Sequence, residues 1–458
     1  MYAARDEVAV RARAGRSSSR LAIVATVFLL LLPLAVNEDD ERRRLAVGWP
    51  AVSSGDEPHY LVALNSLLDD GDLDLADDYW AAAHGWPQAG RRFAGAPLGH
   101  HTAWYVGERH VGWGAVYEVE PSLWQRDASG APQPVVRPHA RGLVRSGPEY
   151  PSHPAGHVLL MAPLLFPLRG TAWVEPAALF VSGVVTIAAL LLFRRLVALF
   201  VDDPGATAVI AAVTFLGTPL WHYGRSLFAE PYLACCAIAA YAVALRARSA
   251  GAALAAGAFV GVGMLMKPPF GVIAIPLAVA LGRALGRRAA LASVAPGAVA
   301  AALVLASNAW MFGAPWRFAQ PLDPGNPAAG AAGLLFSPLH GVVPIAPIAL
   351  VAAAGWPALL RTSPDAWAPG CAFVLYFAVM AIWNDWRGGF CHGPRLVVPV
   401  LPLLCLGLAG ILRAPMWRVR AVRASAIALA LVSIAFSGWA AFHHVAAFDG
   451  HLLAAIAP

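Results

Sequence analysis

Hydrophobic runs of about 20 residues recur along this chain, and each is long enough to cross a bilayer as an α-helix. Of the 458 residues, 59% are hydrophobic and only 13% are charged, which is far from the balance of a soluble domain. The sequence therefore predicts an all-α polytopic membrane protein with about eleven transmembrane helices. The runs cover residues 21–36, 172–193, 205–222, 229–247, 251–266, 269–283, 289–312, 340–360, 366–384, 394–412 and 423–443.

The positive charges lie mostly in short arginine clusters between these runs. The formal net charge is +6, but clusters that flank spans indicate membrane topology, so we exclude nucleic-acid binding. If residues 1–20 are a cytoplasmic tail, alternation of sides places the later clusters on the cytoplasmic face and all 14 histidines on the external face. The expected location is the inner (cytoplasmic) membrane, with the chemistry on the external or periplasmic side. The high alanine and arginine content is typical of a GC-rich bacterium.

A long polar loop, residues 37–170, separates the first span from the second. Within it, residues 58–68 carry leucines at helical spacing and predict an interfacial helix. The apolar run 152–167 is short and contains three prolines. Because counting it as a span would move the arginine clusters outside, we predict a juxtamembrane or re-entrant helix there. Alternating segments elsewhere in the loop, such as 101–105, predict a hairpin.

The rest of the chain divides by the same pattern. We expect residues 21–36 to form the first transmembrane helix, residues 171–312 to hold transmembrane helices 2–7, residues 313–339 to form a second external loop, and residues 340–458 to hold helices 8–11.

An acidic pair, Asp56 and Glu57, follows the first span and precedes Pro58. A carboxylate at a membrane surface can deprotonate an acceptor hydroxyl beside a lipid-linked donor. The alternative is structural, because Asp is a favoured N-cap residue and Asp-Glu-Pro is a good opening for a helix. Both roles are compatible, since a cap would also fix the side chain in place.

Several short motifs together resemble the GT-C class of membrane glycosyltransferases. These are the external Asp56-Glu57 pair, the His153-Pro-Ala-Gly156 start of an amphipathic helix, the segment Tyr223-x-Arg225-x-x-Phe-Ala-Glu230-Pro, and the stretch 383–402 with its Trp-x-x-x-Arg-Gly-Gly-x-x-x-Gly-Pro-Arg pattern. In these motifs and their order, the chain most resembles the protein O-mannosyltransferases and the lipid A aminoarabinose transferase. The resemblance covers the order of elements along most of the chain.

The resemblance implies a GT-C-like bundle and a donor sugar carried on polyprenyl phosphate. It makes Asp56 the catalytic carboxylate, with Glu57 as its supporting neighbour. The leaving phosphate needs no proton, so the enzyme supplies a base for the acceptor and cations for the phosphate. Glu230 is a second candidate carboxylate, either orienting the acceptor or binding a metal, or else simply opening a helix before Pro231.

The candidate phosphate ligands are the cations Arg225, Lys267 and Arg395, each predicted at the external boundary. The alternative is that they snorkel towards lipid head groups. The acceptor or loop candidates are His59, His153, Arg387 and His392.

We predict no metal cofactor, because the relatives that the chain resembles are metal-independent and adjacent carboxylates chelate one ion poorly. A divalent ion at Asp56, Glu57 and Glu230 is the alternative. The five cysteines include no CxxC pair, so no zinc site is indicated.

The predicted reaction moves one sugar from a polyprenyl-phosphate donor to an acceptor on the external face, with inversion and with Asp56 as general base. We expect a lipid-linked or polysaccharide acceptor rather than a protein. The rival function is a transporter or flippase of a lipid-linked substrate, which is expected to carry ionisable residues within its spans, and these spans are mostly Ala, Leu and Val. A third interpretation is a non-catalytic scaffold in which Asp56 only caps a helix.

Overall fold

The computed structural model describes most of the hydrophobic part of the chain. The residues described are 19–34, 56–75, 78, 102–106, 109–111, 124–126, 132–134, 148–171, 173–321, 323–389 and 391–443. Nearly all of the predicted tail 1–20 and much of the loop 37–170 therefore lie outside the described residues.

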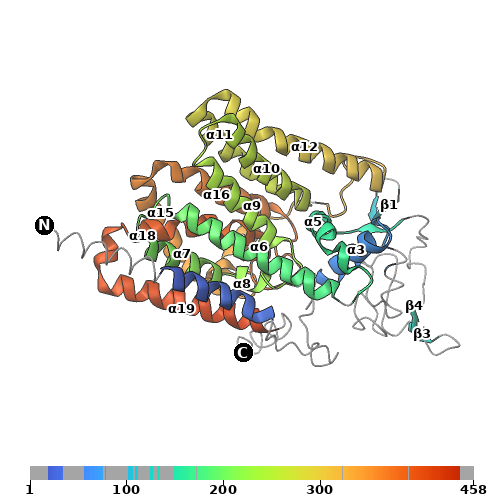
Figure 1. Ribbon diagram of the computed structural model, residues 1–458, viewed down its shortest axis with the longest axis horizontal. Coiled ribbons are helices and arrows are strands. Elements are labelled where there is room, and N and C mark those ends of the chain that lie inside the picture. Colours follow the sequence, from blue (N-terminus) through green and yellow to red (C-terminus); the bar gives the residue numbers. More distant parts are fainter. Residues whose placement is uncertain are drawn as a thin grey trace.

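Helices dominate the described residues (Figure 1). The predicted hydrophobic runs all correspond to helical segments. In chain order these are an N-terminal helix Ser19–Leu34, α3 (Glu57–Asp69), α5 (Gly156–Leu165), α6 (Val174–Val197), α7 (Pro204–Leu216), α8 (Leu220–Tyr223), α9 (Glu230–Ala244), α10 (Ala250–Met266), α11 (Ala274–Leu285), α12 (Arg287–Phe312), α13 (Pro327–Phe336), α14 (Val342–Ile345), α15 (Ile348–Thr362), α16 (Trp367–Ile382), α17 (Leu401–Cys405), α18 (Gly407–Ile411) and α19 (Arg420–Phe442).

Short 3₁₀ segments extend several of these helices. They are η3 (Phe166–Leu168), η4 (Pro268–Ile273), η5 (Pro364–Ala366), η6 (Arg395–Val400) and η7 (Pro415–Arg418). Each contains a proline, which lacks the N–H that an α-helix interior needs.

Five helical segments are long and apolar enough to cross a bilayer: α6, Pro268–Leu285, α12, Pro364–Ile382 and α19. Shorter apolar helices, such as α9 and α10, pack among them. On α12, Leu291 and Val299 are each 60% exposed, as expected for a helix that contacts lipid. The chain is therefore a multi-pass membrane protein of the predicted fold class, whereas the number of eleven crossings stays a prediction.

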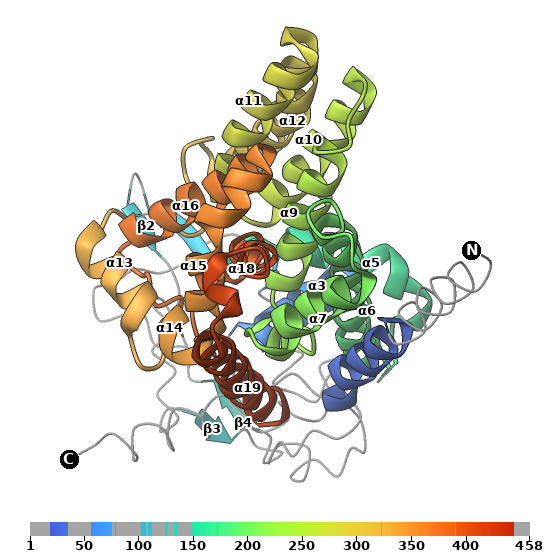
Figure 2. The ribbon, with the colours of Figure 1, turned by 90° about the vertical axis from the view of Figure 1, so that its left-hand side faces the viewer.

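Two packing arrangements organise the bundle. Helix α10 packs along α12 and α9, and α9 in turn packs along α6. Figure 2 shows α10, α11 and α12 extending together away from the other helices, while α19 and the N-terminal helix lie on the opposite side. Gly257 and Gly261 allow the close contact of α10 with α12, because a Cβ at Gly257 would lie 2.0 Å from the carbonyl oxygen of Ser293.

The predicted loop helices are present, and they lie together at one end of the bundle (Figure 1). Helix α5 is the short proline-containing helix, and α3 packs against it. Part of the face of α3 away from its leucines is also covered, because Asn65 and Ser66 are both fully buried, whereas Asp69 is exposed. Other segments of the chain cover that face, which the spacing of the leucines does not reveal.

Strands are few and short. They are β1 (Thr102–Val106), β2 (Arg109–Val111), β3 (Trp124–Arg126), β4 (Pro132–Pro134) and β5 (Tyr150–Pro151). Strand β1 pairs antiparallel with β2, which confirms a hairpin near 101–105, and also with β5 in the order β2-β1-β5. Tyr105 on β1 donates a hydrogen bond from its hydroxyl to the carbonyl oxygen of Phe318 at 2.9 Å, so the hairpin is fastened to the loop after α12.

Candidate active site

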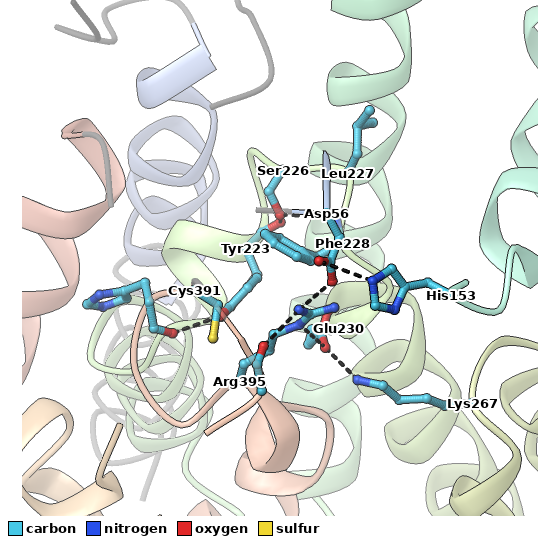
Figure 3. A network of polar contacts seen from close by, with 12 residues as sticks. Asp56, His153, Tyr223, Ser226, Leu227, Phe228, Glu230, Lys267, Cys391 and Arg395 are labelled. Carbon is cyan, nitrogen blue, oxygen red and sulfur yellow. Dashed lines mark hydrogen bonds and ion pairs between the residues drawn. The ribbon is translucent and has the colours of Figure 1, made fainter. Parts of the chain in front are cut away.

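Asp56 lies at the start of α3, but its carboxylate does not cap the helix. The backbone carbonyl of Asp56 accepts hydrogen bonds from the amides of His59 and Tyr60, whereas its side chain makes no capping bond. The carboxylate pairs instead with Arg395, whose Nη1 lies 2.6 Å from Oδ2, and with His153, whose Nε2 lies 3.3 Å from Oδ1 (Figure 3). The helix therefore begins directly after Asp56, while the charge of Asp56 is directed to other elements.

Glu57 points in a different direction from Asp56. It is 1% exposed, and its Oε1 accepts a hydrogen bond from the amide of Leu227 at 2.9 Å. This bond connects α3 to the segment that precedes α9. Glu57 is thus a supporting neighbour of Asp56, and the structure does not place it on the cavity wall.

Glu230 holds two cations with one oxygen. Its side chain is fully buried at the first residue of α9, and its Oε1 lies 2.7 Å from Nζ of Lys267 and 3.1 Å from Nε of Arg395 (Figure 3). Arg395 therefore bridges Glu230 and Asp56, and its guanidinium also lies 4.2 Å from the ring centroid of Phe228. Because buried cations need such partners, the two carboxylates fix where both positive charges lie.

Local sequence places each of these groups. Pro268 and Pro269 end α10 directly after Lys267, the only lysine of the chain, so its side chain leaves the helix there. Gly156 lets α5 begin against the end of α10, since a Cβ there would lie 2.3 Å from the carbonyl oxygen of Leu265. Gly388 has a φ of +76°, which favours glycine, and its carbonyl accepts a hydrogen bond from Nη1 of Arg395 at 3.0 Å.

We refer to Asp56, His153, Glu230, Lys267 and Arg395 as the charged cluster. All of them except Glu230 line a cavity of about 710 Å³. The cavity wall beyond them is largely apolar and is formed in part by Leu159 and Leu160 of α5, Val262 and Leu265 of α10, and Leu303 and Val304 of α12. The cavity thus has a charged end and an apolar side, a combination that suits an amphipathic ligand with an anionic group.

Further polar residues on this wall were not singled out from the sequence. They include Tyr60, Ser307, Asn308, Gln320 and Asp385. Asp385 lies in the loop after α16 and lines the cavity. Partial desolvation raises the pKa of its carboxyl, with Arg395 opposing this effect and Asp56 adding to it. The only sequence signal for Asp385 was its place within the stretch 383–402.

The other candidates from the sequence lie away from the cavity wall. Arg225 is buried and donates a hydrogen bond from Nη2 to the carbonyl oxygen of His443 at 2.8 Å. His392 is buried, and its carbonyl oxygen accepts a hydrogen bond from the hydroxyl of Tyr223 at 2.7 Å. Arg387 stacks on Trp386, and His59 is half-buried on α3.

We refer to His222, Tyr223, Arg225 and His392 as the helix-end cluster, because His222 and Arg225 contact carbonyls at the end of α19.

Within the part of the chain that the structure describes, no three His, Cys, Asp or Glu side chains gather at metal-binding spacing. The charged cluster shows why: Lys267 and Arg395 occupy the positions beside the carboxylates where an ion would need to lie. A metal-independent reaction stays a prediction.

Comparison with known proteins identifies the architecture. No protein-family model and no curated protein matches the chain. Among solved structures, ArnT from Cupriavidus metallidurans bound to undecaprenyl phosphate matches over 94% of this chain and 70% of its own, with a TM-score of 0.51 and 16% identity. The chain has the GT-C fold. The fold predicted from the resemblance is therefore confirmed.

Two structures from Archaeoglobus fulgidus give the same result. One is an oligosaccharyltransferase in the apo form, matched over 94% of this chain, and the other is AglB in complex with an inhibitory peptide and a dolichol-phosphate, matched over 96%. Each has a TM-score of 0.51 and 11% identity. The chain spans only 56% and 59% of these two proteins. At such identities the likeness concerns the fold.

Proposed function

We propose that this protein is a membrane glycosyltransferase that transfers one sugar from a polyprenyl-phosphate donor. The observation that carries the proposal is the placement of Lys267 and Arg395 at the charged end of a cavity whose side is apolar. A polyprenyl phosphate has the same division between an anionic head and an apolar chain. Binding of undecaprenyl phosphate by ArnT and of a dolichol-phosphate by AglB, which share the fold, supports this choice of donor.

The two cations suit the chemistry of the leaving group. When the bond between the sugar and the phosphate breaks, a second negative charge develops on the phosphate. Lys267 and Arg395 are already oriented by Glu230, so they need little rearrangement to stabilise that charge. Glu230 acts in this proposal as a positioning residue, because it holds the cations and does not itself line the cavity.

Asp56 acts in this proposal as the general base that takes the proton of the acceptor hydroxyl. It lies beside Arg395 on the cavity wall, next to where the sugar would be carried. A single displacement at the anomeric carbon inverts its configuration. We further propose a lipid-linked or polysaccharide acceptor on the external face, because the wall also offers Trp316 and Trp383, and indole rings stack well on sugar rings.

The test compares wild type with Asp56→Asn in membranes supplied with a radiolabelled sugar on polyprenyl phosphate. The variant keeps the size of the side chain and removes its charge, so we expect sugar transfer to fall about 10²- to 10⁴-fold. The matched control is Asp365→Asn, an exposed aspartate in η5 that does not line the cavity.

Full activity of the Asp56→Asn variant would remove Asp56 from the mechanism. Absence of transfer by wild type with every polyprenyl-phosphate sugar tried would instead remove the glycosyltransferase function and favour a transporter.

A further inference from the structure

Asp385 places a second carboxylate on the cavity wall, and the proposed reaction does not use it. In the part of the chain that the structure describes, no cation lies within ion-pair distance of this carboxylate and no group donates a hydrogen bond to it, whereas Asp56 pairs with Arg395. Partial desolvation raises the pKa of the Asp385 carboxyl, so this group has lost water without gaining a donor from the protein. A ligand that supplies hydrogen-bond donors would compensate that loss.

The turn that carries Asp385 is fastened to the charged cluster. The amide of Gly388 donates to the carbonyl oxygen of Asp385 at 3.0 Å and closes the turn, and the carbonyl oxygen of Gly388 accepts from Nη1 of Arg395 at 3.0 Å. On its other side, the amide of Asn384 donates to the carbonyl oxygen of Asp323 at 2.9 Å. The ends of a β-turn lie within about 7 Å of each other, so Asp385 is held one turn away from the guanidinium of Arg395.

The backbone before the turn determines which side chains reach the cavity. Trp383 is extended, with a φ of −69° and a ψ of 133°, and it pairs with Pro324 in an antiparallel bridge. Side chains alternate along an extended segment, and accordingly Trp383 and Asp385 line the cavity whereas Asn384 does not. The backbone therefore directs Asp385 to the wall.

Of the three parts of a polyprenyl-phosphate donor, only the sugar can bind a carboxylate. The isoprenoid chain is apolar and the phosphate is anionic, whereas a sugar carries several hydroxyl donors. The two oxygens of an aspartate accept hydrogen bonds from neighbouring hydroxyl groups, and these charge-assisted bonds are strong. The sugar is bonded directly to the phosphate that Lys267 and Arg395 hold in the proposed function, and Asp385 is joined to Arg395 through Gly388.

We propose that Asp385 selects the sugar that is transferred, by accepting hydrogen bonds from ring hydroxyl groups of the donor. This inference rests on the proposed glycosyltransferase function and adds a specificity-determining residue to it. A site built to pair with a hydroxyl discriminates strongly against an analogue that lacks the hydroxyl, because its own polar group is then left without a partner. Asp385 contacts the sugar in this proposal and takes no part in proton transfer.

The first measurement titrates wild type, Asp385→Asn and Asp385→Ala in detergent with polyprenyl phosphate that carries no sugar. This ligand has no ring hydroxyl for Asp385, so the Kd of neither variant should rise by more than about threefold. Binding of the ligand also shows that the variants are folded. A larger loss of affinity would assign Asp385 to the phosphate site and overturn the proposal.

The second measurement compares kcat/KM for radiolabelled donors. Polyprenyl phosphates carrying mannose, glucose, galactose or arabinose identify the donor that wild type uses best, and derivatives of that donor each lack one ring hydroxyl. Wild type should lose about 10- to 100-fold on at least one deoxy donor, the effect of removing a hydrogen bond to a charged group. Asp385→Ala should lose as much on the parent donor but use that deoxy donor as well as wild type does, because the same bond cannot be lost twice.

Asn384→Ala is the matched control, since its exposed side chain adjoins Asp385 but does not line the cavity. The proposal is overturned if Asp385→Ala loses equally on every donor, deoxy donors included, or keeps kcat/KM on the parent donor within about threefold of wild type. It is also overturned if the substitution changes selectivity among deoxy acceptors and not among donors. In each case wild-type transfer leaves the proposed function intact, whereas a wild type that is inactive with every donor overturns both.

Discussion

The charged cluster and the helix-end cluster both draw on the segments 222–230 and 392–395, yet they differ in the partners of their side chains. In the charged cluster, side chains pair with side chains: Arg395 with Asp56 and Glu230, and Lys267 with Glu230. In the helix-end cluster, side chains donate to backbone carbonyls: Tyr223 to that of His392 and Arg225 to that of His443. The first arrangement concentrates charge beside a cavity, and the second satisfies the backbone.

The difference has a simple origin in helix α19. The last carbonyls of an α-helix lack partners within the helix, and a cation there also interacts favourably with the helix dipole. His222 contacts the carbonyl oxygen of Ala440 through Nδ1 at 2.8 Å, and Arg225 donates to that of His443. One motif, Tyr223-x-Arg225-x-x-Phe-Ala-Glu230-Pro, therefore supplies both clusters. Its residues have separate roles, with Arg225 in structure and Glu230 in the placement of charge.

The largest effect is expected at Arg395, the residue that connects both carboxylates of the charged cluster. Arg395→Leu leaves Asp56 and Glu230 without the cation that bridges them. Removing one partner of a buried ion pair typically costs about 3–5 kcal/mol of stability. We also expect sugar transfer to fall more than about 10³-fold, since the leaving phosphate loses a stabilising cation. Thermal unfolding in detergent and the radiolabel assay measure the two effects.

Arg395→Lys keeps the charge but loses the planar fork with which Nε and Nη1 reach Glu230, Asp56 and the carbonyl of Gly388, so it should remain at least about 10-fold slower than wild type. Arg361→Leu, an exposed arginine at the end of α15, is the matched control. Wild-type transfer by Arg395→Lys would show that the bridging geometry has no part in catalysis.

A smaller and different effect is expected at Arg225. Arg225→Gln removes the charge-assisted hydrogen bond to the end of α19, which should lower the free energy of unfolding by about 1.5–3 kcal/mol. Transfer per folded molecule should stay within about threefold of wild type, because Arg225 does not line the cavity. A large loss of kcat with unchanged thermal stability would instead return Arg225 to the phosphate site that the sequence predicted.

The sequence predicted the helical segments well, because a bilayer requires long apolar runs and these are directly visible. It did not separate α13, which has only 10 residues and lies in the expected external loop 313–339. It also could not show that α3 is buried on its polar side, since burial of Asn65 depends on segments that are distant in sequence. Hydropathy thus reports contact with lipid more reliably than contact with protein.

The candidate site was predicted to the extent that its residues are conspicuous. Lys267 lies between apolar runs, and Asp56 and Glu57 follow a span. Charged side chains near lipid cost free energy, so their presence there indicates a function. Asp385 and Gln320 lie in polar loops, where nothing distinguishes them. The pairing of Asp56 with Arg395 across most of the chain could not be derived, because no periodicity connects residues on different helices.

The smallest effect is expected at His392, and it depends on pH. Burial lowers the pKa of His392 to about 3, and the charge of Arg225 adds to this effect. In the unfolded chain the histidine pKa is about 6.5, so between these two values the unfolded state binds a proton that the folded state does not. The stabilisation that neutral His392 gives the folded state is therefore complete above about pH 6.5, and it decreases as the pH falls. His392→Gln should therefore lose less thermal stability than wild type between about pH 7.5 and about pH 5, a range that spans the ordinary pKa of histidine. Unfolding midpoints in detergent measure this difference.

Parallel curves for wild type and His392→Gln would contradict a neutral, buried His392. A neutral imidazole also offers no charge for an anionic donor, which sets His392 apart from Lys267 and Arg395. The backbone carbonyl of His392, which accepts a hydrogen bond from the hydroxyl of Tyr223, would be unaffected by the substitution. The kcat of sugar transfer at pH 7.5 should accordingly stay within about threefold of wild type, since the change leaves the charged cluster complete.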